Sequence, residues 1–136
     1  TLLEYNNVLL KGKKVTVVGR STLVGKPTAL AFLNKGSTVT ICHRDTLNLK
    51  LETKKADILV VAVGKPNFIS KNHIKRGQVI VDVGINHIGK NGKTKIVGDV
   101  NFKNVKNLVN KISPVPGGVG PMTILSLFEN LLIARD

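Results

Sequence analysis

The sequence predicts an α/β fold: a parallel sheet with helices on both faces. Two observations support this class. Apolar, β-rich runs alternate with helical or loop segments along the chain. One of these runs leads through a glycine turn directly into a helix start, in the segment VTVVGRSTLVGKP at residues 15–27. Repeated strand–helix units with right-handed crossovers produce a parallel sheet covered by helices. Because no repeat or low-complexity linker interrupts the 136 residues, we expect one domain over residues 1–136.

The expected elements follow from hydrophobic periodicity and from stop signals such as Gly36. Strands are expected at residues 15–18, 38–42, 58–63 and 79–83, with a short fifth at 95–97 and another beginning at 112. Helices are expected at residues 28–35, 102–111 and 121–135, with a helical fragment at residues 2–5. The last helix has apolar residues on more than one face, so it needs two neighbours. One is expected to be the sheet, and the other a partner domain or subunit.

The glycine turn after the first strand is the most informative local pattern. It reads Gly19-x-Ser21-x-x-x-Gly25, which departs from the common dinucleotide pattern G-x-G-x-x-G. Pro27 suits a first helical turn, and the free N–H groups of a helix start attract phosphate. Ser21 stands where the middle glycine would be and can donate a hydroxyl hydrogen bond. The pattern favours a Rossmann-like dinucleotide site, although any tight strand–helix turn also favours glycine.

Composition narrows the function classes. The formal net charge is +13, which favours anionic partners, but the lysines are spread along the chain. With five Phe and Tyr residues and no Trp, no base-stacking platform is evident, so a solvated lysine-rich surface is favoured over nucleic-acid binding. No apolar run reaches the roughly 20 residues that span a bilayer, and no secretory signal is visible. The single cysteine, Cys42, fits a reducing cytoplasm, so we expect a cytoplasmic protein without membrane partners.

The end of the second strand bears on the choice between NAD and NADP. NAD-binding folds usually place an acidic residue there to hold the ribose 2′-hydroxyl. Here the strand ends in His43 and Arg44. With Arg20 nearby, two guanidinium groups would surround a 2′-phosphate, which favours NADP over NAD. Asp45 is the counter-evidence, because a shift of one residue would present its carboxylate to the ribose. For Arg20 and His43, a solvent-exposed surface position is the alternative.

Several segments carry a resemblance to a known family. They are VGRSTLVGKP at 18–27, CHRDT at 42–46, ADILV at 56–60, VDVGIN at 81–86, VGDV at 97–100 and PVPGGVGPMT at 114–123. Over its full length the chain resembles the cofactor domain of the bifunctional methylenetetrahydrofolate dehydrogenase/methenyltetrahydrofolate cyclohydrolase family. The resemblance implies a domain that binds NADP and forms one wall of a folate site. It implies that the full-length protein transfers hydride to NADP⁺ and then hydrates the product.

The resemblance also implies roles for particular residues. It implies that Gly19, Arg20 and Ser21 bind the cofactor and that Ile85 contacts it near the nicotinamide ribose. His43 and Arg44, at the end of the second strand, and Gly64, at the end of the third, complete the expected cofactor-binding set from their positions. The implied folate-binding set lies in one loop that lines the cleft between domains: Pro116, Gly117, Gly118, Val119 and Gly120. Three glycines and two prolines within residues 116–121 are also more than a simple connector needs.

The family takes its catalytic lysine from an N-terminal domain, in a Tyr-x-x-x-Lys motif. The only tyrosine here, Tyr5, is followed by Asn-Asn-Val-Leu, so no catalytic residue is expected in this chain. The resemblance implies that an N-terminal catalytic domain and a second copy are partners. Lys65 is interpreted as an exposed loop lysine and Cys42 as an inert buried thiol. Two alternatives stay open: the cofactor domain of another Rossmann dehydrogenase, and a basic, non-enzymatic binding module.

Three other aspartates and two histidines have no metal-ligand spacing, namely Asp57, Asp82, Asp99, His73 and His87. No metal site is therefore expected. Asp57 is expected at the start of a strand, and Asp82 is expected to make a structural hydrogen bond.

Overall fold

Five parallel strands form the central sheet, in the order β2-β1-β3-β4-β7. The computed structural model describes residues 1–90 and 93–135. The strands are β1 (Lys14–Val18), β2 (Thr38–Cys42), β3 (Ile58–Val61), β4 (Val79–Asp82) and β7 (Lys111–Ile112). The chain runs from β1 outward to β2 and then returns to the other side of β1 as β3. In open α/β sheets, ligands bind where the order reverses in this way, at the carboxyl ends of the strands.

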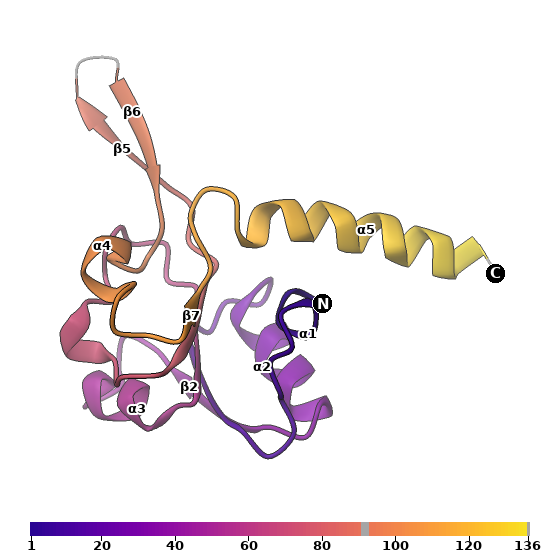
Figure 1. Cartoon of the computed structure of the whole chain (residues 1–136), viewed down its shortest axis with the longest axis horizontal. Helices are drawn as coiled ribbons and strands as arrows, with labels where there is room; N and C mark the ends of the chain where they lie inside the picture. Colours follow the sequence, from indigo (N-terminus) through magenta and orange to yellow (C-terminus); the bar gives the residue numbers. More distant parts are fainter. Residues whose placement is uncertain (91–92, 136) are drawn as a thin grey trace.

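Helices cover both faces of the sheet, as the sequence predicts (Figure 1). On one face lie α1 (Leu2–Tyr5) and α2 (Gly25–Asn34), and on the other lie α3 (Leu49–Lys55), the 3₁₀ turn η1 (Lys71–His73) and α4 (Phe102–Val105). Alternate side chains of each strand serve the two faces. Val15 and Val17 pack with Phe32 of α2, whereas Val18 packs with Val105 of α4.

Some expected bounds are wrong. The helix expected at 102–111 ends at Val105, because the following backbone pairs elsewhere: Gly77 N–H donates to Leu108 O at 3.1 Å, and Asn110 N–H donates to Gln78 O at 2.9 Å. Strands β3 and β4 end one or two residues early, where buried carboxylates take over the backbone N–H groups. The sequence analysis missed α3, whose N-cap Asn48 accepts from Leu51 N–H at 3.1 Å, and it missed η1.

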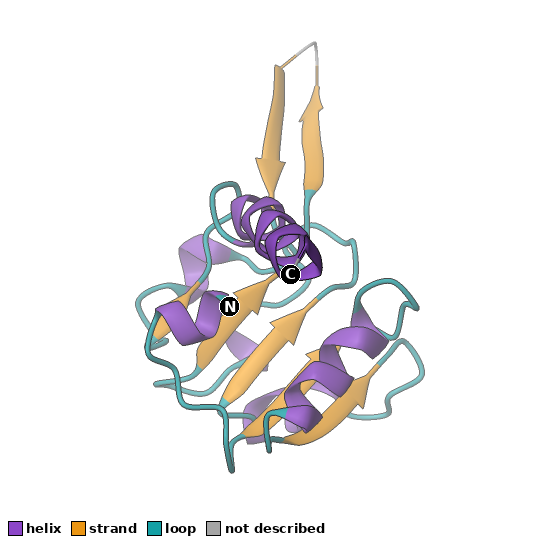
Figure 2. Cartoon of the chain, turned by 90° about the vertical axis from the view of Figure 1, so that its right-hand side faces the viewer, coloured by secondary structure: helices purple, strands orange, loops and turns teal. Residues whose placement is uncertain are grey.

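The strand expected at 95–97 exists, but it does not join the sheet. It is part of β6 (Lys93–Val97), which pairs antiparallel with β5 (Asn86–Lys90). A parallel partner needs a crossover connection of a dozen residues or more, and the link between β5 and β6 is far shorter. The two strands form a hairpin that projects from the domain (Figures 1 and 2).

Helix α5 (Val119–Arg135) extends away from the domain instead of packing on the sheet (Figure 1). None of its described residues is buried, so the expectation that the sheet covers one face is wrong. Its large apolar side chains, such as Phe128 at 61 % exposure, face solvent. Helix α5 contacts the rest of the chain through, among others, a 3.4 Å hydrogen bond that Tyr5 Oη donates to Glu129 Oε1. A partner domain over this helix therefore stays a prediction.

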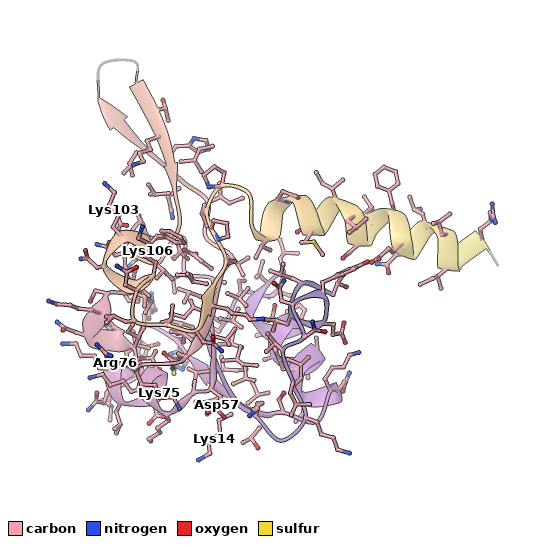
Figure 3. All side chains as sticks on the ribbon, viewed as in Figure 1. Lys14, Asp57, Lys75, Arg76, Lys103 and Lys106 are labelled. Carbon is pink, nitrogen blue, oxygen red and sulfur yellow. The ribbon has the colours of Figure 1, made fainter. Side chains whose placement is uncertain are left out.

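The amino ends of the strands carry a surface of charged side chains. Figure 3 shows Asp57 close to Lys14, at the end of the molecule opposite the β5–β6 hairpin. Asp57 precedes β3 as expected and accepts from Lys14 N–H at 3.0 Å and from Lys75 Nζ at 3.2 Å. The Lys14 N–H bond lowers the pKa of the Asp57 carboxyl below its usual value. Lys103 and Lys106 on the α4 side are exposed, in keeping with a solvated basic surface. No described helix has the length and apolar character that crossing a membrane requires.

Candidate functional site

Gly19 marks the point where the carboxyl ends of β1, β2 and β3 converge. Its φ is +130°, a conformation that side-chain-bearing residues rarely adopt. Its N–H donates to Cys42 O of β2 at 2.8 Å. A Cβ atom at this position would lie 2.2 Å from Ala62 O, just after β3. The position therefore accepts only glycine, and it is buried where the three strand ends meet.

The start of α2 is pressed against this turn. A Cβ atom on Gly25 would lie 2.2 Å from Gly19 O, so only glycine allows the helix to approach the turn this closely. The expectation of free N–H groups is wrong for this structure, however. Ser21 Oγ accepts from Val24 N–H and Gly25 N–H at 3.2 Å each, and Ser21 O accepts from Lys26 N–H at 3.0 Å.

Ser21 thus accepts the N–H groups at the start of α2, and Pro27, in the first turn, has no N–H to offer. The hydroxyl oxygen of Ser21 is used as an acceptor, which leaves its hydrogen available to donate to a ligand. Ser21 is exposed, so a ligand oxygen can reach it. A phosphate at this turn would meet this hydroxyl and the neighbouring Arg20 side chain before it met helix amides.

At the end of β2 the structure brings together the charged residues that the sequence analysis singled out. Arg20 Nη2 lies 3.4 Å from Asp45 Oδ2, and Arg44 Nε lies 3.5 Å from Asp45 Oδ1. His43 Nδ1 is 3.5 Å from Asp45 Oδ2 and accepts a hydrogen bond from Asp45 N–H at 3.2 Å. This leaves His43 Nε2 to donate outward. The turn is closed by Thr46, whose Oγ1 accepts from His43 N–H at 2.9 Å.

The buried Asp99 holds the loop that follows β3. Its carboxylate accepts three successive N–H groups, from Val63 at 2.6 Å, Gly64 at 2.9 Å and Lys65 at 3.0 Å. It also accepts from Asn86 Nδ2 at 2.8 Å. Successive N–H groups that converge on an anion form a compact nest. Asp99 thereby fixes Gly64 at the carboxyl edge of the sheet, a role that the sequence analysis did not assign.

Asp82 organises the next segment along the same edge, as expected of a structural aspartate. Its Oδ1 accepts from Gly84 N–H and Asp99 N–H at 3.0 Å each, and its Oδ2 accepts from Val100 N–H at 2.9 Å. Burial raises the pKa of the Asp82 carboxyl above its usual value, while these N–H groups oppose the rise. The two aspartates thus connect the ends of β3 and β4 through their side chains.

Ile85 and the proline–glycine loop line one pocket of about 320 Å³. Ile85 is 62 % exposed, so its side chain is accessible from the pocket. Gly118 is held tightly in the loop, because a Cβ atom there would lie 2.4 Å from Pro114 O. The predicted folate-binding set shares this pocket with Ile85: Pro116, Gly117, Gly118, Val119 and Gly120. Val119 and Gly120 belong to the first turn of α5, which begins two residues earlier than expected.

Two residues that could suggest chemistry have structural explanations. Lys65 is exposed, and its Nζ lies 5.8 Å above the centre of the Phe68 ring, which fits an ordinary loop lysine. Cys42 is 1 % exposed, and burial raises the pKa of its thiol. Within residues 1–90 and 93–135, no three His, Cys, Asp or Glu side chains are grouped as a metal ion would need.

Cys42 is expected to resist alkylation in the native protein. The thiolate is the reactive form, and burial both disfavours it and blocks access. Incubation with iodoacetamide at mildly alkaline pH, followed by mass spectrometry, should show little modification until urea unfolds the chain. Equal modification rates with and without urea would contradict the buried position of this thiol.

Comparison with known proteins places this geometry in a family. The model of the tetrahydrofolate dehydrogenase/cyclohydrolase NAD(P)-binding domain matches residues 1–136. The bifunctional protein FolD of Thermodesulfovibrio yellowstonii is 52 % identical over 133 residues, which cover 98 % of this chain and 46 % of that protein. FolD of Bacillus subtilis is 55 % identical over 129 residues, or 95 % of this chain and 44 % of that protein. The chain therefore spans less than half the length of these relatives.

Solved structures agree. The bifunctional enzyme FolD from Campylobacter jejuni superposes with a TM-score of 0.89 at 45 % identity, over 94 % of this chain and 44 % of that one. FolD from Trypanosoma brucei, solved with NADP cofactor and inhibitor, gives a TM-score of 0.89 at 36 % identity, over 96 % of this chain and 46 % of that one. The chain belongs to the tetrahydrofolate dehydrogenase/cyclohydrolase family and corresponds to its NAD(P)-binding domain.

Proposed function

We propose that this chain is the NADP-binding half of a methylenetetrahydrofolate dehydrogenase/methenyltetrahydrofolate cyclohydrolase. The observation that carries the proposal is the surface at the carboxyl ends of β1 and β2, where Arg20 of the glycine turn and Arg44 both lie beside Asp45. The match to the family's NAD(P)-binding domain over residues 1–136 supports the same function. The Trypanosoma brucei relative was solved with NADP, which favours that cofactor.

The residues present fit a dinucleotide phosphate. Gly19 is buried and has no room for a Cβ atom, so the chain turns tightly there and exposes Arg20 and Ser21 directly after β1. Ser21 offers a hydroxyl hydrogen, and Arg20 is half-exposed with its guanidinium at the mouth of the turn. Arg44 is 85 % exposed and stands at the end of β2, where Rossmann folds hold the ribose. Guanidinium groups bind phosphate in a bidentate manner, so the pair suits a 2′-phosphate.

When bound, the nicotinamide supplies the hydride chemistry, and the protein supplies position and electrostatics. Ile85 lies beside the proline–glycine loop in one pocket, so it can pack against the reactive end of the cofactor. The loop at residues 116–120 forms the wall that would face the folate. The Asp99 and Asp82 hydrogen bonds hold these segments in place, which is the positioning that hydride transfer requires.

In this proposal the proton-handling lysine comes from a further, N-terminal domain, and a second copy of the protein completes a dimer in the cytoplasm. Phe128 and the other exposed apolar residues of α5 are consistent with such a partner domain. The 136-residue chain should therefore bind NADP(H) weakly and turn over neither substrate.

A chimera tests the proposal directly. The chain should replace the matching segment of Bacillus subtilis FolD, to which it is 55 % identical over 129 residues. The chimera is expected to reduce NADP⁺ with methylenetetrahydrofolate and to hydrolyse methenyltetrahydrofolate, both followed by absorbance, while the chain alone does neither. A folded chimera that binds NADP⁺ but lacks both activities would argue for a different substrate, and turnover by the chain alone would contradict the assigned division of labour.

A further inference from the structure

The Asp45 carboxylate occupies the place that the proposed function gives to the 2′-phosphate of NADP. It is the acidic side chain that lies within 3.5 Å of nitrogen atoms from Arg20, His43 and Arg44. The two guanidinium groups that would hold a 2′-phosphate are therefore already facing an anion of this chain. A second anion can use them fully only if the carboxylate moves away.

Breaking the ion pairs between Asp45 and the two arginines requires little free energy. The Arg20–Asp45 pair is 3.4 Å apart, with side-chain exposures of 53 % and 59 %, and Arg44 is 85 % exposed. Ion pairs at such exposure contribute little to stability, because water screens them. From residues 1–90 and 93–135, the side chain of Asp45 accepts no backbone N–H bond that would fix it. Its backbone N–H is held by His43 Nδ1 at 3.2 Å, so the carboxylate can swing while the turn stays in place.

The same carboxylate can serve NAD. A ribose 2′-hydroxyl needs an acceptor at the end of the second strand, and an acidic residue there is the usual NAD determinant. Asp45 is the third residue after β2 and supplies such an acceptor, with His43 Nε2 free to donate beside it. The turn thus holds a phosphate-binding arginine pair and a hydroxyl-binding carboxylate in one place.

We propose that Asp45 is a specificity-determining residue that competes with the 2′-phosphate for Arg20 and Arg44, weakens the preference for NADP and permits use of NAD. This inference rests on the proposed function, because it concerns the same cofactor site. It predicts a site that binds both cofactors, with a modest preference for NADP that the charge of one side chain sets.

The test is the ratio of NADP⁺ to NAD⁺ affinity, measured by calorimetric titration of the 136-residue chain. Asp45→Asn is expected to tighten NADP⁺ binding about tenfold, since one close like-charge contact is removed, and to weaken NAD⁺ binding a few-fold. Asp45→Glu keeps the charge and should keep a ratio near that of the parent. Asp57→Asn is the matched control, because it makes the same change at the amino ends of the strands, and it should alter the ratio less than twofold.

Each outcome decides something different. A ratio that stays within twofold in Asp45→Asn, while both cofactors bind, overturns the inference and leaves the proposed function standing. A fall in NADP⁺ affinity in Asp45→Asn also overturns it, because the carboxylate would then support the phosphate site. If the parent chain binds neither cofactor, the inference and the proposed function both fail.

Discussion

Replacing Gly19 by alanine is expected to abolish NADP⁺ binding and to lower the free energy of unfolding by about 3 kcal/mol. Two effects add. The φ of +130° is strained for any residue with a side chain, and the new Cβ would lie 2.2 Å from Ala62 O. The Cβ position is fixed by the Gly19 backbone and the oxygen belongs to the Ala62 backbone, so the clash cannot be relieved without moving the ends of β1 or β3. The chain should still fold, because the rest of the core is unchanged.

Gly12→Ala is the matched control for this substitution. Gly12 also has a positive φ, +76°, but a Cβ atom there would meet nothing within 4 Å. The Gly12→Ala variant should lose about 1 kcal/mol in its free energy of unfolding, and its cofactor binding should be unaffected. Urea unfolding and NADP⁺ titration of both variants separate the clash from the backbone strain. Similar stability losses for the two variants, with binding intact in Gly19→Ala, would contradict the close convergence of β1 and β3.

Asp99→Asn is expected to cost about 4 kcal/mol of stability and to loosen the loop after β3. Asp99 is fully buried, and its carboxylate accepts three backbone N–H groups and the Asn86 amide. An asparagine side chain keeps one acceptor oxygen and turns an N–H₂ group toward these donors. Several buried donors are then left without partners, and each carries a desolvation penalty. The expected signs are a lower urea midpoint and faster amide exchange at Val63, Gly64 and Lys65.

Asp57→Asn again supplies the comparison, because it makes the same chemical change at an exposed position. Asp57 accepts from Lys14 N–H and pairs with Lys75, with about 41 % side-chain exposure. The Asp57→Asn variant should lose less than about 1 kcal/mol in its free energy of unfolding. If Asp99→Asn proves no more costly than Asp57→Asn, the Asp99 carboxylate does not hold the loop after β3 at the carboxyl edge of the sheet.

The parts of the site that sequence predicted well are those encoded locally. A β-branched run followed by Gly19 and Gly25 specifies strand, turn and helix within a dozen residues, and all three form. The hydrogen bonds from the helix N–H groups to Ser21 were not expected. A serine in such a turn can either donate its hydroxyl hydrogen to a phosphate or accept hydrogen bonds from nearby backbone N–H groups. Spacing alone does not distinguish the two.

Other features depend on contacts between distant residues. Asp99 binds Val63 N–H, 36 positions earlier, so no local pattern reveals its role. The helix expected at 102–111 fails for the same reason, since the backbone at Asn110 pairs with Gln78. The hairpin of β5 and β6 was misjudged because a strand-forming pattern does not say which strand it will pair with. The apolar residues of α5 predicted the sheet as one neighbour, but in the structure they face solvent, and the second neighbour stays a prediction.

The most direct test of the account is to map where NADP⁺ binds on the chain by NMR, using amide shifts of the ¹⁵N-labelled protein during titration. The proposed cofactor site predicts saturable shifts that gather at Gly19, Ser21, Arg44, Gly64 and Ile85, with the amino-end residues near Asp57 unmoved. Shifts confined to α5 or to the β5–β6 hairpin, or no saturable shifts at all, would contradict the placement of the cofactor at the carboxyl edge of the sheet.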